Sequence, residues 1–172
     1  MSDHARYLEE CRQHFLAATN GLTDEQAKTR PASDRWSVIE CVEHVALVED
    51  RFLGVLDDAR RLDAPATNKD NELSLRGRLS NRVTKFEAPD VVQPAGRHTT
   101  LADAIAAFNA VRDRSVRFAT EREGDLYWIS VQHPRFGTMS GGELLTLLDA
   151  HARRHADQID EARQAIGHPA DA

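Results

Sequence analysis

Apolar residues recur every three or four positions along four stretches of the chain, the spacing that places them on one face of an α-helix. The clearest stretch runs from residue 144 to residue 166. Its stripe consists of Leu144, Leu148, His151, His155, Ile159, Ala162 and Ile166. Two imidazoles therefore take the place of leucines, and a spacing of four makes them project from successive turns of one face. Because an unpaired buried polar ring costs about 1 to 3 kcal/mol, the two rings need a metal or hydrogen-bonding partners from facing helices.

Helix-start signals support the periodicity. Ser37 with Glu40 and Ser140 with Glu143 form S-x-x-E capping boxes, each at the start of an apolar run. The predicted long helices cover residues 5–18, about 38–62, about 101–121 and about 144–166. A further box, Thr23 with Gln26, predicts a short helix after the first long one.

The segments between these helices are less regular. Residues 64–99 contain several prolines, and a short helix is predicted within 72–86 because a structureless connection of that length is uncommon. Residues 126–138 read as an ordered loop or short hairpin. We therefore predict one all-α domain over 1–172, a four-helix bundle in which the long connection between the second and third long helices lets those two run parallel.

Composition excludes several classes of function. The 172 residues carry a formal charge of −6 and no basic patch, which argues against binding nucleic acid or an anionic membrane. Neither a signal peptide nor an apolar run long enough for a membrane span is present, so a cytoplasmic location is expected. Cys11 and Cys41 fall within helical patterns and are expected to be buried thiols rather than a disulfide.

A third imidazole lies in a second apolar stripe. His44 is flanked by Cys41 and Val48 on the inward face of the second long helix. Facing helices in bundles are about 8 to 10 Å apart, so His44 could meet His151 and His155 at one ion. Three histidines with an open fourth position are typical of a catalytic zinc site, although imidazole also suits nickel, iron and copper. Such an ion polarises carbonyls or activates water or a thiol, which indicates a hydrolase or a transferase.

Other interpretations remain open at this point. The histidines could instead be polar core residues without an ion, since a single HxxxH pair is weak support for ligation. Ala152 follows His151, so the zinc-peptidase HExxH motif is missing, and no helix carries the E-x-x-H of di-iron bundles. Glu40 is assigned to capping, and Glu43 is expected to point away from His44. Aromatic candidates for shaping a cavity are Trp36, Tyr127, Trp128 and Phe136.

In their order and spacing, these motifs resemble the DinB-like family, specifically its DinB_2 branch. The resemblance rests on Trp36-Ser37 followed by Glu40 and His44, then Phe136-Gly137, the leucine-rich stretch from Glu143, and His151-x-x-x-His155-x-x-Gln158-Ile159. It extends from the first helix to about Ile166.

The resemblance implies a four-helix bundle of up-down-down-up order, often a homodimer, that binds one divalent ion, nickel or zinc, through three histidines. The matching positions are His44, His151 and His155. It also implies either a thiol S-transferase or hydrolase acting on a small electrophilic substrate, with a low-molecular-weight thiol as a second cofactor, or a non-catalytic metal- or ligand-binding stress protein. No side chain is assigned as catalytic, because a metal-bound water or thiol would be the reactive group.

Overall fold

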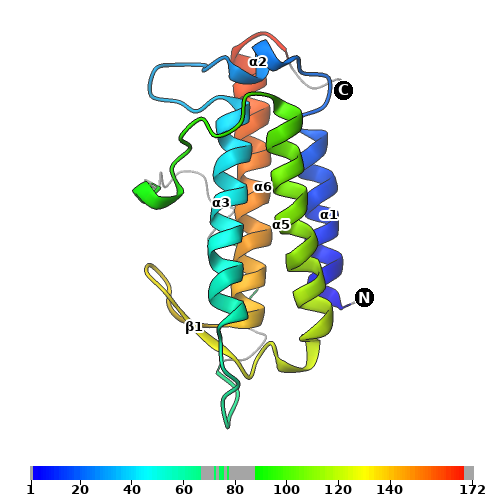
Figure 1. The fold of residues 1–172 in the computed structure, drawn as a ribbon, viewed down its shortest axis with the longest axis vertical. Coiled ribbons are helices and arrows are strands. Elements are labelled where there is room, and N and C mark those ends of the chain that lie inside the picture. Colours follow the sequence, from blue (N-terminus) through cyan, green and yellow to red (C-terminus); the bar gives the residue numbers. More distant parts are fainter. Residues whose placement is uncertain (1, 67–71, 73, 76, 78–87, 169–172) are drawn as a thin grey trace.

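The computed structural model describes residues 2–66, 72, 74, 75, 77 and 88–168. It is mostly helical (Figure 1). The α-helices are α1 (Asp3–Ala17), α2 (Asp24–Lys28), α3 (Val38–Asp57), α5 (Leu101–Glu121) and α6 (Gly141–Ala165). The 3-10 helices are η1 (Asp90–Val92) and η2 (Glu123–Asp125), and the strands are β1 (Ser130–His133) and β2 (Gly137–Ser140).

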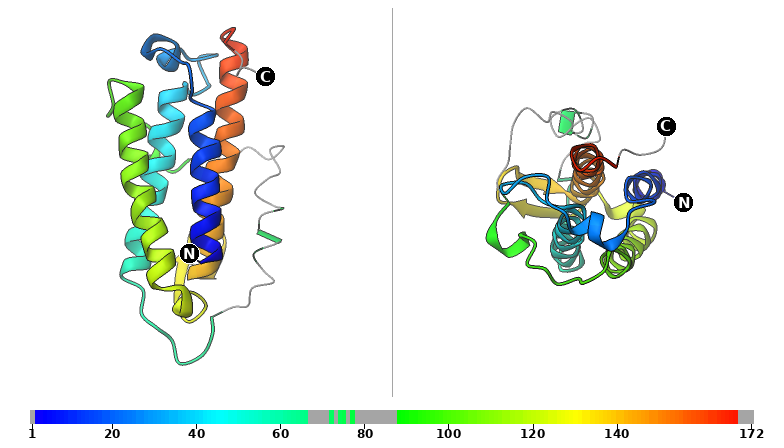
Figure 2. Two further views of the ribbon diagram at one scale, coloured as in Figure 1. Left: turned by 90° about the vertical axis from the view of Figure 1, so that its right-hand side faces the viewer. Right: turned by 90° about the horizontal axis from the view of Figure 1, so that it is seen from above.

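The four long helices form a bundle of up-down-down-up order, as predicted. Helices α1 and α6 run in one direction, whereas α3 and α5 run in the other (Figure 1). Each long helix packs against two others: α1 and α3 both contact α5 and α6. Seen along the bundle, α3 therefore lies beside α6 (Figure 2), and these two neighbours are antiparallel. This pairing is what can bring residue 44 close to residues 151 and 155.

Capping fixes where the helices begin. Ser37 and Ser140 each accept a hydrogen bond from the backbone of the residue three positions later, and Glu40 and Glu143 complete the two predicted capping boxes. The box of the short helix α2 is also present. These contacts satisfy backbone N–H groups that have no partner inside the helix.

The predicted end of the second long helix was wrong. Helix α3 stops at Asp57 rather than near Leu62, and Val55 near its end is 37% exposed. The chain beyond it pairs with another segment instead: Leu62 donates its backbone N–H to the Trp128 carbonyl, and Arg61 forms a β-bridge with Ile129. Pairing with the segment before β1 thus replaces the last helical turn.

Part of the connection between α3 and α5 lies outside the described residues, and so does most of the short helix predicted over 72–86. Its described end contains η1, which begins directly after Pro89. Val92 closes η1 with a buried side chain. This end of the connection runs past α3 and contacts His44, one of the predicted metal ligands.

A hairpin precedes α6, as one of the two predicted alternatives allowed. Strands β1 and β2 are antiparallel, with His133 opposite Gly137, whose positive φ of 72° suits glycine at the turn. The hairpin leads into Gly141. A Cβ at this glycine would lie 2.7 Å from Cδ1 of the buried Ile129 and 3.0 Å from the Leu126 carbonyl oxygen, so a larger residue would force its neighbours to shift.

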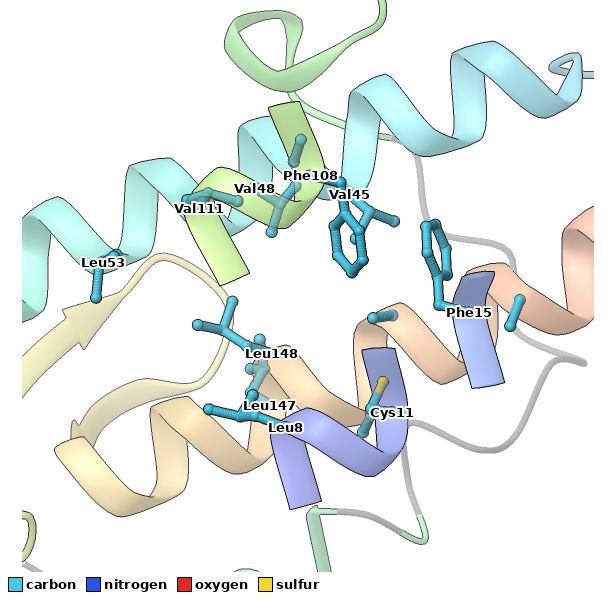
Figure 3. Packing of buried hydrophobic residues seen from close by; sticks show 14 of the residues in the cluster. Leu8, Cys11, Phe15, Val45, Val48, Leu53, Phe108, Val111, Leu147 and Leu148 are labelled. Carbon is cyan, nitrogen blue, oxygen red and sulfur yellow. The ribbon is translucent and has the colours of Figure 1, made fainter. Parts of the chain in front are cut away.

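The core runs along the whole bundle. Close packing between α1 and α5 includes Phe15 and Phe108, whose ring centroids are 4.7 Å apart (Figure 3). Cys11 and Cys41 are buried free thiols, as expected. None of the described helices combines the length and the apolarity that a membrane span requires.

A buried ion pair that the sequence analysis missed crosses this core. Arg112 of α5 donates from Nε and Nη2 to the two carboxylate oxygens of Glu49 of α3, both at 2.7 Å, and both side chains are fully buried. Its Nη1 donates to the Leu8 carbonyl of α1 at 2.8 Å. Three helices are therefore joined by one guanidinium group.

Candidate metal centre

Helices α3 and α6 bring the three predicted histidines together. His44 lies in the second turn of α3, and His151 and His155 lie one turn apart on α6. His44 and His155 are buried, whereas His151 is half-buried. Within the described part of the chain, this is the one group of three or more histidine, cysteine or acidic side chains whose ligand atoms converge closely enough to hold a metal ion.

The three rings point their Nε2 atoms toward a common centre. Nε2 of His151 lies 3.2 Å from Nε2 of His44 and 3.2 Å from Nε2 of His155. A tetrahedral zinc ion with ligands at about 2.0 to 2.1 Å would place ligand nitrogens about 3.3 Å apart. Two of the three spacings match this value, and all three ligand atoms lie within 4.8 Å of one another, so the cluster is close enough to hold one ion.

The positions of the imidazole protons also favour a cation at this centre. The Val92 carbonyl can only accept, so Nδ1 of His44, 2.7 Å from that oxygen, carries the proton, and Nε2 of the neutral ring presents a lone pair. His151 faces both other Nε2 atoms and can donate to only one of them. Whichever tautomer His151 adopts, at least one of the two 3.2 Å contacts is then not a well-formed hydrogen bond, and such close nitrogens are unfavourable unless a cation lies between them. The donor set thus fits a divalent metal.

Burial keeps these rings neutral. It lowers the pKa of His151 to about 3, helped by the nearby His44 and by the positive charges of Arg154 and Arg112. Burial likewise lowers the pKa of His155 well below its usual value. The pKa of His44 is lowered by burial as well, although the hydrogen bond to Val92 partly opposes this. Neutral imidazole is the form that binds metals, so the apoprotein holds the site ready for ligation at neutral pH.

Trp36 forms one wall of the centre. Its ring centroid is 4.7 Å from that of His44, and it stacks at 6.2 Å on His155 with an interplanar angle of 20°. Trp36 directly precedes Ser37, the N-cap of α3. The capping box therefore fixes both the start of the helix and the place where this indole meets the histidines.

The other aromatic candidates contact different parts of the molecule. Tyr127 donates to Glu72 at 2.7 Å, and the Trp128 ring packs under the Arg61 guanidinium at 4.4 Å. Phe136 lies beside His133 in the hairpin. Among these aromatic residues, it is Trp36 whose ring packs against His44 and His155.

Other polar side chains form ion pairs or hydrogen bonds of their own. Arg153 pairs with Asp149, four residues earlier on α6, at 3.1 Å, and Glu40, which caps α3, also pairs with Arg30. His4 of α1 is buried against Glu72 at 3.1 Å.

Sequence reasoning missed the role of Glu43. This side chain is 2% exposed and accepts from the backbone N–H groups of Ala95 and Arg97 at 2.8 and 3.1 Å. Burial raises its pKa, but these bonds and the Arg97 guanidinium outweigh burial and lower it overall. A helical wheel shows that Glu43 turns away from His44, yet it cannot show that a distant loop supplies its partners.

Comparisons with known proteins agree with this architecture. The sequence model of the DinB superfamily matches residues 7–159. YuaE of Bacillus subtilis (strain 168), described as an uncharacterized protein, is 24% identical over 160 residues, which are 92% of this chain and 96% of YuaE. The solved structure of YfiT from Bacillus subtilis, described as a probable metal-dependent hydrolase with an unusual four-helix bundle topology, matches with a TM-score of 0.60. At 16% identity, covering 97% of this chain and 90% of YfiT, this likeness establishes the fold alone.

Proposed function

This chain belongs to the DinB superfamily, and from that premise we propose that it is an enzyme dependent on one divalent metal ion, held by His44, His151 and His155. The proposed reaction is attack by water or a small thiol on a small electrophilic substrate. The observation that supports it most is the convergence of three Nε2 atoms with 3.2 Å between neighbours. Three protein ligands leave a fourth position for a reacting molecule, as in catalytic rather than structural zinc sites.

The bound ion and the surrounding protein would make different contributions to this chemistry. When bound, the ion would polarise an electrophile and lower the pKa of a water or thiol nucleophile. The protein supplies neutral imidazoles through burial, and the Val92 carbonyl sets the orientation of His44. Trp36 shields one side of the rings from water. His151 is the most exposed of the three ligands, so we propose that a substrate approaches from its side.

Hydrolysis and thiol transfer are both compatible with three imidazoles. The description of YfiT as a probable metal-dependent hydrolase supports the first, and the thiol-dependent members implied by the sequence motifs support the second. Nickel and zinc are the proposed metals, because the resemblance of the sequence motifs implies them and imidazole suits both.

Metal analysis tests the proposal directly. Protein purified without added metal or chelator should contain about one nickel or zinc ion per chain. His44→Ala and His151→Ala should each reduce metal affinity by more than the roughly 10- to 100-fold typical of changes outside the ligand shell. His133→Ala, which alters a hairpin ring in contact with Phe52 and Phe136, is the matched control and should bind like the wild type. Full metal retention in both ligand variants would refute the site.

A second candidate is a non-catalytic protein in which the ion mainly ties α3 to α6. It is favoured by the composition of the cluster, which among the described residues includes no carboxylate that could act as a general base. Assays with water, low-molecular-weight thiols and activated esters or epoxides distinguish the two. Turnover that disappears with chelator and returns with metal supports the enzyme, whereas metal-dependent stability without turnover supports the second candidate.

A further inference from the structure

Two adjacent residues of α3 hold the same stretch of chain. His44 donates from Nδ1 to the Val92 carbonyl at 2.7 Å. Glu43 accepts from the N–H groups of Ala95 at 2.8 Å and Arg97 at 3.1 Å. Both ends of segment 92–97 are therefore hydrogen-bonded to one turn of α3. One of the two α3 side chains that hold it, His44, is a candidate metal ligand.

The Glu43 carboxylate is committed to this segment. Its third bond comes from Nη1 of Arg97 at 2.9 Å, so three hydrogen bonds join it to residues 95 and 97. A carboxylate that is 2% exposed requires such donors, because a buried charge without them is strongly unfavourable. The contact thus cannot be exchanged for water without moving the loop.

The segment depends on this carboxylate in turn. After η1 ends at Val92 it contains no regular structure, and Pro94 has no N–H to donate. Gly96 adopts a positive φ of 70°, a turn that lies between the two N–H groups bonded to Glu43. Helical or strand pairing therefore does not hold this stretch, whereas Glu43 does.

The position of Val92 decides which nitrogen of His44 faces the ion. A neutral imidazole carries one proton, and a carbonyl acceptor at Nδ1 selects the tautomer whose Nε2 is free to ligate. If the carbonyl moved away, the ring would populate both tautomers and rotate more freely. Ligand basicity and ring orientation at metal sites are commonly set by such outer partners.

We propose that Glu43 is a positioning residue for the metal centre: by holding Ala95 and Arg97 it keeps the Val92 carbonyl on Nδ1 of His44 and so directs Nε2 to the ion. The proposal rests on the function proposed above for the three histidines. Its rival is that the buried Val92 side chain alone places the carbonyl, in which case the carboxylate is dispensable.

Glu43→Gln tests the proposal, because glutamine keeps the shape but removes the charge and one acceptor oxygen. Glu40→Gln is the matched control on the same helix, since Glu40 contacts Ser37 and Arg30 but not the segment. The first measurement is the imidazole ¹⁵N spectrum of the metal-free protein, which reports the tautomer of His44. We expect one Nδ1–H form in the wild type and in Glu40→Gln, and a mixture in Glu43→Gln.

The second measurement is zinc affinity by chelator competition. Glu43→Gln should weaken zinc binding by about 10- to 100-fold, the range typical of outer-shell partners. The Glu40→Gln control should stay within about twofold of the wild type. Unchanged tautomer and unchanged affinity in Glu43→Gln would overturn the proposal and support the rival.

The two proposals can fail separately. If the wild type does not bind zinc, the proposed function fails, while the ¹⁵N spectrum of the apoprotein still decides whether Glu43 sets the ring of His44. If Glu43→Gln does not fold, Arg97→Ala replaces it, because this half-exposed side chain supplies only one of the three bonds. A smaller shift in the same direction is then expected, and wild-type behaviour in both measurements would overturn the inference.

Discussion

Nε2 of His44 lies 3.2 Å from Nε2 of His151, although 107 positions separate the two residues in the sequence. The contact spans the interface between α3 and α6, so the packing of these two helices sets the geometry of the metal centre. Metal binding by these histidines should therefore depend on the correct packing of α3 against α6.

Bound metal should stabilise the bundle. An ion that joins α3 to α6 binds only the folded chain, and at 100 times its dissociation constant it would add about 2.7 kcal/mol to the free energy of unfolding. For a chain of this size the melting temperature should rise by about 5 to 10 °C. Thermal unfolding with increasing zinc measures this effect. His155→Gln should show no zinc-dependent rise, and an equal rise in this variant would place binding elsewhere.

Tryptophan fluorescence should detect the ion. The Trp36 ring lies 4.7 Å from that of His44, so an open-shell ion such as copper(II) or nickel(II) held by the histidines should quench its emission. The chain contains two tryptophans, and Trp128→Phe leaves Trp36 as the only emitter. Emission in this variant should fall as metal is added.

Trp36→Phe is the control for that experiment, because it leaves Trp128, which packs against Arg61 instead. Its emission should change little with metal. Quenching confined to Trp128 would mean that the ion binds away from the three histidines.

Acid should destabilise the metal-free protein in a defined pH range. Burial keeps the folded-state pKa of His151 at about 3 and lowers that of His155 and His44, whereas in the unfolded chain these pKa values are about 6.5. Above the unfolded value neither state binds the extra protons. As the pH falls below about 6.5, the unfolded chain takes them up first, and stability decreases by up to about 1.4 kcal/mol per pH unit for each ring that stays neutral.

Urea unfolding between pH 7.5 and pH 5 measures this loss. His151→Gln should show a shallower decrease than the wild type, because one ring no longer contributes. The carboxylates whose pKa values are lowered in the folded state, such as Glu43 and Glu72, lose their contribution only at more acidic pH, so they do not obscure this range. Stability that is constant across the range would contradict the burial of the three rings.

Breaking the buried pair of Arg112 and Glu49 should be strongly destabilising. Arg112→Met or Glu49→Leu alone leaves a buried charge without its partner, and each should lower the free energy of unfolding by about 3 to 5 kcal/mol. The double variant should lose less than the sum of the two, since neither charge remains. Denaturant unfolding of the four proteins gives the coupling energy. Additive losses would show that the two groups do not stabilise each other.

Much of this protein follows from interactions that are local in the sequence. The period of the apolar positions predicted the four long helices, and the S-x-x-E pairs at Ser37 and Ser140 located the starts of α3 and α6. Hydrogen bonds within a helix join residues only a few positions apart, so a short stretch of sequence determines both the helix and the face that it buries. The same local pattern placed His151 and His155 on one face, and His44 on an inward face.

Tertiary structure alone decided whether those faces meet. The 3.2 Å approach of His44 to His151 depends on the register and rotation of α3 against α6, which no short window encodes. Two partners of Glu43 are backbone N–H groups and that of His44 is a backbone carbonyl, groups that almost every residue carries and no sequence motif marks. A backbone contact also explains why α3 ends earlier than its pattern predicted: after the helix, the Leu62 N–H donates to the Trp128 carbonyl.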